Sequence, residues 1–130
     1  MFLKIDDGKL NIHHHLPVKD IETKYRESAL YVLPSRFEGF GMVLIEAMAT
    51  GLPCVAFDCN YGPSDIIKDQ HDGMLVPVGN VMQLADAINR LIESETLRVR
   101  MGHTAQKSVM RYTPERIMAC WDELFKSLTR

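Results

Sequence analysis

Short apolar runs alternate with amphipathic stretches along the chain from residue 20 onward. Three of these runs are almost wholly apolar, which is typical of strands that are buried on both faces of a parallel sheet. They predict strands at residues 29–34, 53–57 and 73–77. A weaker pattern predicts a further short strand at residues 9–13.

Helices are predicted between and after these strands by capping residues and by 3.6-residue periodicity. Asp20 is the expected N-cap of a helix over residues 21–28, and Gly51 the expected end of a helix over 42–50. Gly62 and Pro63 begin a short helix that reaches about residue 69. Three longer helices follow. The first covers residues 81–93, with Asn80 and Gln83 as a capping box. The others cover 95–111 after Ser94 and 114–128 after Thr113.

Two of the C-terminal helices carry an apolar face. The first predicted face consists of Val81, Leu84, Ala85, Ile88, Leu91 and Ile92. The second consists of Ile117, Cys120, Trp121, Leu124 and Leu128. Such a stripe is expected to pack against other parts of a protein.

The alternation predicts the α/β fold class: a partial Rossmann-like parallel sheet with flanking helices and a helical C-terminus. A length of 130 residues indicates one domain over residues 1–130. Three strands are few for this architecture, so the chain is interpreted as the second half of a Rossmann-like domain, with more strands expected upstream.

Composition and charge exclude several functions. The chain is 46% hydrophobic and 25% charged, as in folded soluble domains. A net charge of −2 with scattered basic residues argues against binding to nucleic acid. No apolar run approaches a membrane span, and the polar start is unlike a signal peptide, so a cytoplasmic protein is expected. Peripheral contact with the inner membrane stays open.

Cysteine and histidine give no metal site. Cys54, Cys59 and Cys120 lack metal-ligand spacing, and they are interpreted as reduced thiols. The neighbouring residues His13, His14 and His15 cannot all face one ion in regular structure, because consecutive side chains diverge.

The stretch SRFEGFGMVLIEAMATG, residues 35–51, follows a predicted strand and leads into a helix. Ligands of open α/β sheets bind at the carboxyl ends of strands. Gly39 and Gly41 flank Phe40, and glycine lets a backbone approach a ligand closely. The free N–H groups of Met42 and Val43 then favour an anion such as a diphosphate.

Two carboxylates frame this loop. Glu38 lies in the loop, and Glu46 lies about one turn into the helix, where its side chain leans back toward the loop. Glu46 can accept hydrogen bonds from a ribose diol, while Glu38 lies nearer to where a sugar would be. The alternative is a solvated surface position for Glu46. Its apolar sequence neighbours in LIEAM favour the functional interpretation, since an unpaired carboxylate among them would be costly.

Glu38 and Glu46 with seven residues between them resemble the E-x7-E motif of the group 1 (family 4) retaining glycosyltransferases of GT-B fold. The segment EGFGMVLIEAMATGLPCVAFD is similar to that family's donor-site segment. YRESALYVLPS, GPSDII and DGMLVPVGN are similar to the flanking segments. The resemblance covers about residues 10–128.

The resemblance implies transfer of a sugar from a UDP- or GDP-linked donor to an acceptor hydroxyl, with no cofactor and no metal. It implies that Glu46 binds the ribose and that Glu38 is the catalytic residue at the donor sugar, where a positioning role is favoured over nucleophilic attack. Gly39, Phe40 and Gly41 would approach the sugar through their backbone, and the amides of Met42 and Val43 would bind the diphosphate.

The chain also departs from this family. The family has two Rossmann-like domains, and the N-terminal acceptor domain has no counterpart in these residues. The basic contacts to the diphosphate from the start of the second domain are missing too, and Arg36 does not match them. We therefore expect a truncated C-terminal nucleotide-sugar-binding domain with little activity alone. GPSDII hints at polysaccharide or lipopolysaccharide biosynthesis.

Two other functions stay open. One is a non-catalytic nucleotide-binding module, which would need Glu46 but not Glu38. The other is a self-associating interaction protein, because a narrow sheet exposes strand edges. The pair of glutamates favours the transferase.

Overall fold

Three parallel strands form the centre of the structure, in the order β1 (Tyr31–Leu33), β2 (Cys54–Phe57) and β3 (Gly73–Val76). The computed structural model of the chain describes residues 12–129. In the register of the sheet, Cys54 lies between Tyr31 and Gly73. All of β2 is buried. The predicted α/β class and its three strands are thus confirmed, with each strand one to three residues shorter than predicted.

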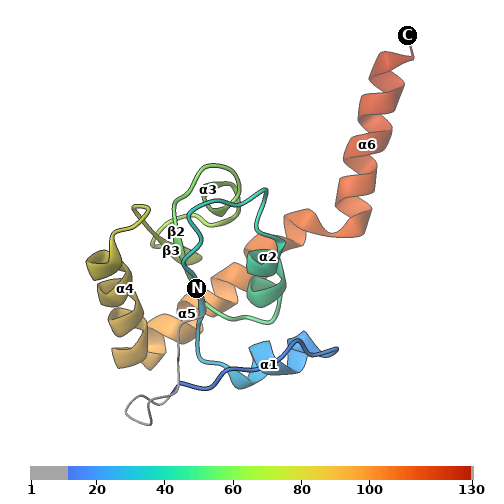
Figure 1. Ribbon diagram of the computed structural model, residues 1–130. Coiled ribbons are helices and arrows are strands. Elements are labelled where there is room, and N and C mark those ends of the chain that lie inside the picture. Colours follow the sequence, from blue (N-terminus) through green and yellow to red (C-terminus); the bar gives the residue numbers. More distant parts are fainter. Residues whose placement is uncertain (1–11, 130) are drawn as a thin grey trace.

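Alternate residues of β2 face two separate cores. Cys54 and Ala56 pack in one core with α1 (Ile21–Glu27) and α2 (Met42–Ala49). Val55 and Phe57 pack in the other core. The remaining elements next to the sheet are α3 (Pro63–Ile66), α4 (Val81–Glu93), α5 (Glu95–Ser108) and the 3-10 helix η1 (Val109–Tyr112). Figure 1 shows α4 on one side of the strands and α2 on the other.

Helix α5 connects the two cores. Its Met101 is buried in the core beneath α4, whereas its Ala105 is buried in the core beneath α2. In Figure 1 this helix runs past the sheet between those two sides. The predicted arrangement of helices on both faces is therefore present.

The predicted caps are the ones that the chain uses. Asp20 accepts a hydrogen bond from the N–H of Thr23 at 3.1 Å, and Ser94 accepts one from the N–H of Leu97 at 3.2 Å. Asn80 does the same for α4. Gly51 ends α2 with a positive φ of 80°, as expected for a helix stop.

Four details differ from the sequence prediction. The helix predicted to reach about residue 69 ends at Ile66. Residues 9–11 of the predicted first strand lie outside the described residues, and residues 12 and 13 are in no strand. The helix predicted to reach residue 111 ends at 108 and tightens into η1. The inner face of α4 contains Ala87 in place of Val81, Ala85 and Ile92, which are all exposed, because Leu84, Ala87, Ile88 and Leu91 form a narrower stripe.

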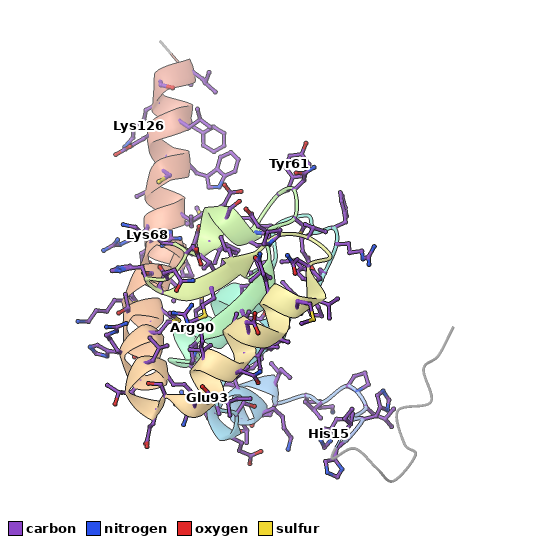
Figure 2. The ribbon with its side chains drawn as sticks, turned by 90° about the vertical axis from the view of Figure 1, so that its left-hand side faces the viewer. His15, Tyr61, Lys68, Arg90, Glu93 and Lys126 are labelled. Atoms are coloured by element: carbon purple, nitrogen blue, oxygen red, sulfur yellow. The ribbon has the colours of Figure 1, made fainter. Side chains whose placement is uncertain are left out.

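Helix α6 (Pro114–Leu128) has no buried residue. It begins after Thr113 as predicted, and its apolar face is present but uncovered, with Trp121 49% and Leu128 70% exposed. Both figures show α6 standing clear of the rest of the chain, with Lys126 near its far end in Figure 2. Among the described residues, no helix is long and apolar enough to cross a membrane.

Candidate functional site

The loop that leaves β1 enters α2 through Gly41. This glycine is the N-cap of α2 and has left-handed backbone angles, φ 88° and ψ 46°, which side chains other than glycine rarely adopt. It offers no side-chain cap, and the first turn of α2 contains no acidic residue. The first N–H groups, those of Met42 and Val43, are therefore available to an external acceptor. The positive end of the helix dipole lies at the same place.

Gly39 differs from Gly41 in what surrounds it. A Cβ built at Gly39 would have no neighbour within 4 Å, and its φ lies outside the positive range. A Cβ at Gly41 would meet ordinary contacts, but its φ is positive. The fold thus requires glycine at 41 and leaves room for a side chain at 39. Open space in front of Gly39 is where another molecule can approach the backbone.

The two candidate carboxylates lie near the same aromatic ring. The pKa of Tyr31 is raised, first by burial and then by electrostatic interactions with Cys54, Glu38 and Glu46. Tyr31 lies in β1, while Glu38 follows that strand and Glu46 belongs to α2. Both predicted glutamates therefore lie close enough to Tyr31 to act on its ionisation.

Glu46 also has a partner that the sequence did not indicate. The hydroxyl of Tyr25, on α1, donates a hydrogen bond to Oε2 of Glu46 at 3.3 Å. Burial, with smaller contributions from Tyr31 and Glu46, raises the pKa of Tyr25 to about 12, so this hydroxyl stays protonated at neutral pH. Because Tyr25 is 21 positions from Glu46 in the sequence, no local pattern reveals the pair.

The environment of Glu46 corrects one sequence argument. Glu46 is exposed instead of being enclosed by its apolar sequence neighbours. The reason is helical geometry, since α2 turns Leu44, Ala47 and Met48 inward and Glu46 outward. Its carboxylate contributes to the wall of an open pocket of about 310 Å³. The residues that line this pocket are Ile21, Glu22, Tyr25, Glu46, Ala49 and Thr50.

The other predicted residues of the loop lie at the surface. Phe40 is 39% exposed and Met42 is 64% exposed, and Val43 is half-buried against the core. Glu38 is half-buried as well. The amides of Met42 and Val43, the open glycine and Glu38 thus lie at the start of α2, and Glu46 lies further along this helix, facing α1. This arrangement can bind an anion through N–H groups and hydroxyl groups through carboxylates.

Cysteine thiols and groups of metal-binding side chains form no part of the candidate site among the described residues. Within residues 12–129, no group of three or more His, Cys, Asp and Glu side chains could hold a metal ion. Cys54 and Cys59 are buried free thiols, and Cys120 is exposed. Burial, together with the carboxylate of Asp72, raises the pKa of Cys54. This thiol therefore stays protonated and unreactive.

Residues 7–108 match the protein family described as "Glycosyl transferases group 1". The chain is 41% identical over 108 residues to the amylovoran biosynthesis glycosyltransferase AmsD of Erwinia amylovora, covering 83% of this chain and 30% of that protein. It is 36% identical over 130 residues to the lipopolysaccharide 1,6-galactosyltransferase of Escherichia coli, covering 96% of this chain and 31% of that protein.

A solved structure also resembles the chain. HepE of Anabaena, crystallised in complex with UDP, matches with a TM-score of 0.79 and 28% identity, over 85% of this chain and 30% of the other. The chain thus spans less than a third of the length of each of these three proteins.

Proposed function

Because the chain belongs to the group 1 glycosyltransferases, we propose that the edge formed by Glu38, Glu46 and the first turn of α2 is part of the donor site of a retaining sugar transferase. The donor would be a UDP- or GDP-linked sugar, and the acceptor a hydroxyl group. Since the chain spans less than a third of its relatives, we assign the acceptor site to an N-terminal domain outside this sequence. Transfer would require that domain, so the chain alone would be inactive.

The uncapped first turn of α2 is the observation that carries this proposal. Gly41 leaves the amides of Met42 and Val43 free, and the helix dipole adds a positive partial charge there. These groups suit a diphosphate and need no metal ion. The exposed carboxylate of Glu46 would accept hydrogen bonds from the ribose hydroxyls. Tyr25 would hold it from α1 through the 3.3 Å hydrogen bond.

Glu38 would act at the sugar end of the donor. The open space beside Gly39 lets the backbone of Gly39, Phe40 and Gly41 come close to a sugar ring. As the bond to the diphosphate breaks, positive charge develops on the anomeric carbon, and the carboxylate of Glu38 would stabilise it. In our proposal Glu38 positions the sugar and does not attack it, and the acceptor approaches from the face that the diphosphate leaves.

We infer the class of pathway from the relatives. One is a glycosyltransferase of amylovoran biosynthesis and another a lipopolysaccharide galactosyltransferase. A structural neighbour was crystallised with UDP and with UDP-glucose. These names support a nucleotide-sugar as the donor and a polysaccharide or lipopolysaccharide as the product.

The test is a titration of the chain with UDP, GDP and their glucose conjugates, in wild type, Glu46→Gln and Glu38→Gln. We expect Glu46→Gln to weaken the binding of nucleotide and of nucleotide-sugar alike by about tenfold, because one charge-assisted hydrogen bond is lost. Glu38→Gln should weaken only the nucleotide-sugar. An added chelator should change neither affinity.

Other results would point elsewhere. If nucleotide binds and Glu38→Gln changes nothing, the chain is a non-catalytic nucleotide-binding module. If neither ligand binds to wild type, the donor-site assignment for this chain is wrong.

A further inference from the structure

Phe40 is the point at which the loop before α2 is held in place. Among the described residues, no hydrogen bond joins residues 36–40 to the rest of the chain. Packing must therefore fix the conformation of this segment. Two contacts do so at Phe40, one through its backbone and one through its ring.

The backbone contact comes from Gly62, the residue before α3. Gly62 has φ 114° and ψ −67°, a conformation that is open only to glycine. A Cβ at Gly62 would collide with the carbonyl oxygen of Phe40 and lie 2.5 Å from its carbonyl carbon. The two backbones thus touch directly, and any side chain at position 62 would push Phe40 away.

The ring contact comes from Tyr112, the last residue of η1. The rings of Phe40 and Tyr112 meet edge to face, with centroids 5.7 Å apart. The hydroxyl of Tyr112 donates a hydrogen bond to the backbone oxygen of Asp65 at 2.9 Å. Its ring therefore cannot swing away from the loop without breaking this bond.

Arg111 ties the two contacts together. Its guanidinium lies 4.7 Å from the centre of the Tyr112 ring. It also donates hydrogen bonds to the backbone oxygens of Asp65 and Ile66, at 3.2 and 2.6 Å. The carboxylate of Asp65 in turn accepts a hydrogen bond from the N–H of Gly62 at 3.3 Å. Gly62, Asp65, Arg111 and Tyr112 thus form one connected support, which we call the Phe40 seat.

We propose that Gly62 and Tyr112 are positioning residues for the donor loop, acting through Phe40. By fixing Phe40 they set where the carboxylate of Glu38 and the amides of Met42 and Val43 lie relative to each other. The identity of the ligand rests on the function proposed above, but the positioning of the loop does not. Neither residue belongs to the segment that contains the two glutamates, and Tyr112 lies beyond the residues that match the family.

The first experiment needs no ligand. It compares the amide resonances and amide hydrogen exchange of residues 38–43 in wild type, Gly62→Ala and Gly79→Ala. Gly79 is a matched control, because its φ is also positive, at 79°, while a Cβ there would meet nothing within 4 Å. We expect Gly62→Ala to shift these resonances and speed their exchange, and Gly79→Ala to leave them unchanged. Equal behaviour of the two variants in this loop would overturn the proposal.

Tyr112 supplies a second pair of variants if Gly62→Ala fails to fold. Tyr112→Phe keeps the ring against Phe40, and Tyr112→Leu removes it. The resonances of residues 38–43 should change strongly in Tyr112→Leu and less in Tyr112→Phe, which keeps the ring contact and loses only the hydrogen bond to Asp65. Unchanged resonances in Tyr112→Leu would refute the role of this ring.

Binding then shows the consequence for the donor. We expect Tyr112→Leu to weaken the binding of UDP-glucose by about tenfold, because binding groups of the loop that are out of position contribute much less. The loss of affinity for UDP should be smaller. Tyr112→Phe should recover affinity relative to Tyr112→Leu. A residue of purely structural importance would lower the melting temperature and leave the ratio of the two affinities unchanged. If no variant or wild type binds either ligand while the resonances shift as expected, the proposed function fails and the Phe40 seat stands.

Discussion

Two glycines of the same loop are needed for different reasons. Gly41 has a left-handed backbone that caps α2, so its replacement acts on the fold. Gly39 has neither a positive φ nor a neighbour within 4 Å, so nothing within the described chain requires glycine there. A requirement for glycine at position 39 would have to come from a bound molecule.

We therefore expect Gly39→Ala to keep the free energy of unfolding within about 0.5 kcal/mol of wild type. The same change should weaken nucleotide-sugar binding by about tenfold, because the added methyl group would occupy space next to the sugar. Urea unfolding and ligand titration on the same samples measure both quantities. A loss of stability that parallels the loss of affinity would mean that the loop itself was disturbed.

The ionisation of Tyr25 should make the free energy of unfolding depend on pH in the alkaline range. Its pKa is about 12 in the folded chain against about 10 when unfolded, so the folded state holds the proton more tightly. This contribution is fully present below pH 10 and is lost as the pH rises toward 12. We expect wild type to lose roughly 2 kcal/mol more than Tyr25→Phe over that range. Urea unfolding of both proteins at several pH values measures the difference, and parallel curves would contradict it.

At this scale the sequence predicted where the loop enters α2, which the structure confirms, but it did not predict the residues that support the loop. Residues 38–43 are consecutive in the sequence, so local spacing alone places them at the start of a helix. Tyr25 reaches Glu46 from another helix, and Gly62 and Tyr112 reach Phe40 from later segments. Such partners are set by tertiary packing, which leaves no periodic signal in one sequence.

Helices α2 and α5 approach each other at a pair of glycines. A Cβ at Gly102, within α5, would collide with the backbone oxygen of Gly51 and lie 3.0 Å from its carbonyl carbon. Gly102 is buried, and Gln106, one turn later, donates a hydrogen bond to the backbone oxygen of Ala49. The absence of a side chain at 102 thus sets how closely α5 packs on the end of α2.

Replacing Gly102 by alanine should destabilise the chain, although alanine usually stabilises a helix relative to glycine. Alanine is normally favoured over glycine by about 1 kcal/mol in a helix interior. At Gly102 we expect a net loss of about 2 kcal/mol, since the methyl group would force two backbones apart. His103→Ala, at the exposed neighbouring position, is the control and should be nearly neutral. Urea unfolding compares the variants, and a more stable Gly102→Ala would show that the helices do not meet here as described.

The sequence predicted the elements through signals that act locally. Caps at Asp20, Asn80 and Ser94 and the stop at Gly51 depend on residues at most four positions apart, and the structure confirms them. The inner face of α4 was predicted less well. Apolar residues there form a wide stripe, and only the neighbouring strands determine that Ala87 is buried while Ile92 is not.

The whole molecule divides into a packed body and a separate helix. Helix α6 has an apolar row but buries none of it within the described chain. The charges of α6 are mixed, with acidic Glu115, Asp122 and Glu123 and basic Arg116 and Lys126. A basic helix that adsorbs to an anionic membrane has a different pattern. The apolar row is thus better suited to another protein surface than to lipid.

We expect a chain that ends at Thr113 to unfold with a free energy within about 1 kcal/mol of the full chain, because α6 adds no buried side chain to the body. Unfolding in urea, followed by circular dichroism, tests this. We also expect the mass of the full chain in solution to rise with concentration and that of the shortened chain to stay constant. A large loss of stability on shortening would mean that α6 packs against the body.

The position of Trp121 determines what an optical experiment on this protein would observe. It is the only tryptophan in the sequence, it stacks on Phe125 with ring centroids 5.6 Å apart, and it lies on the helix that stands apart from the body. Indole fluorescence would therefore change when another protein surface binds to α6. Unfolding of the core would change it very little. The same isolation makes Trp121 a built-in reporter for whatever covers α6.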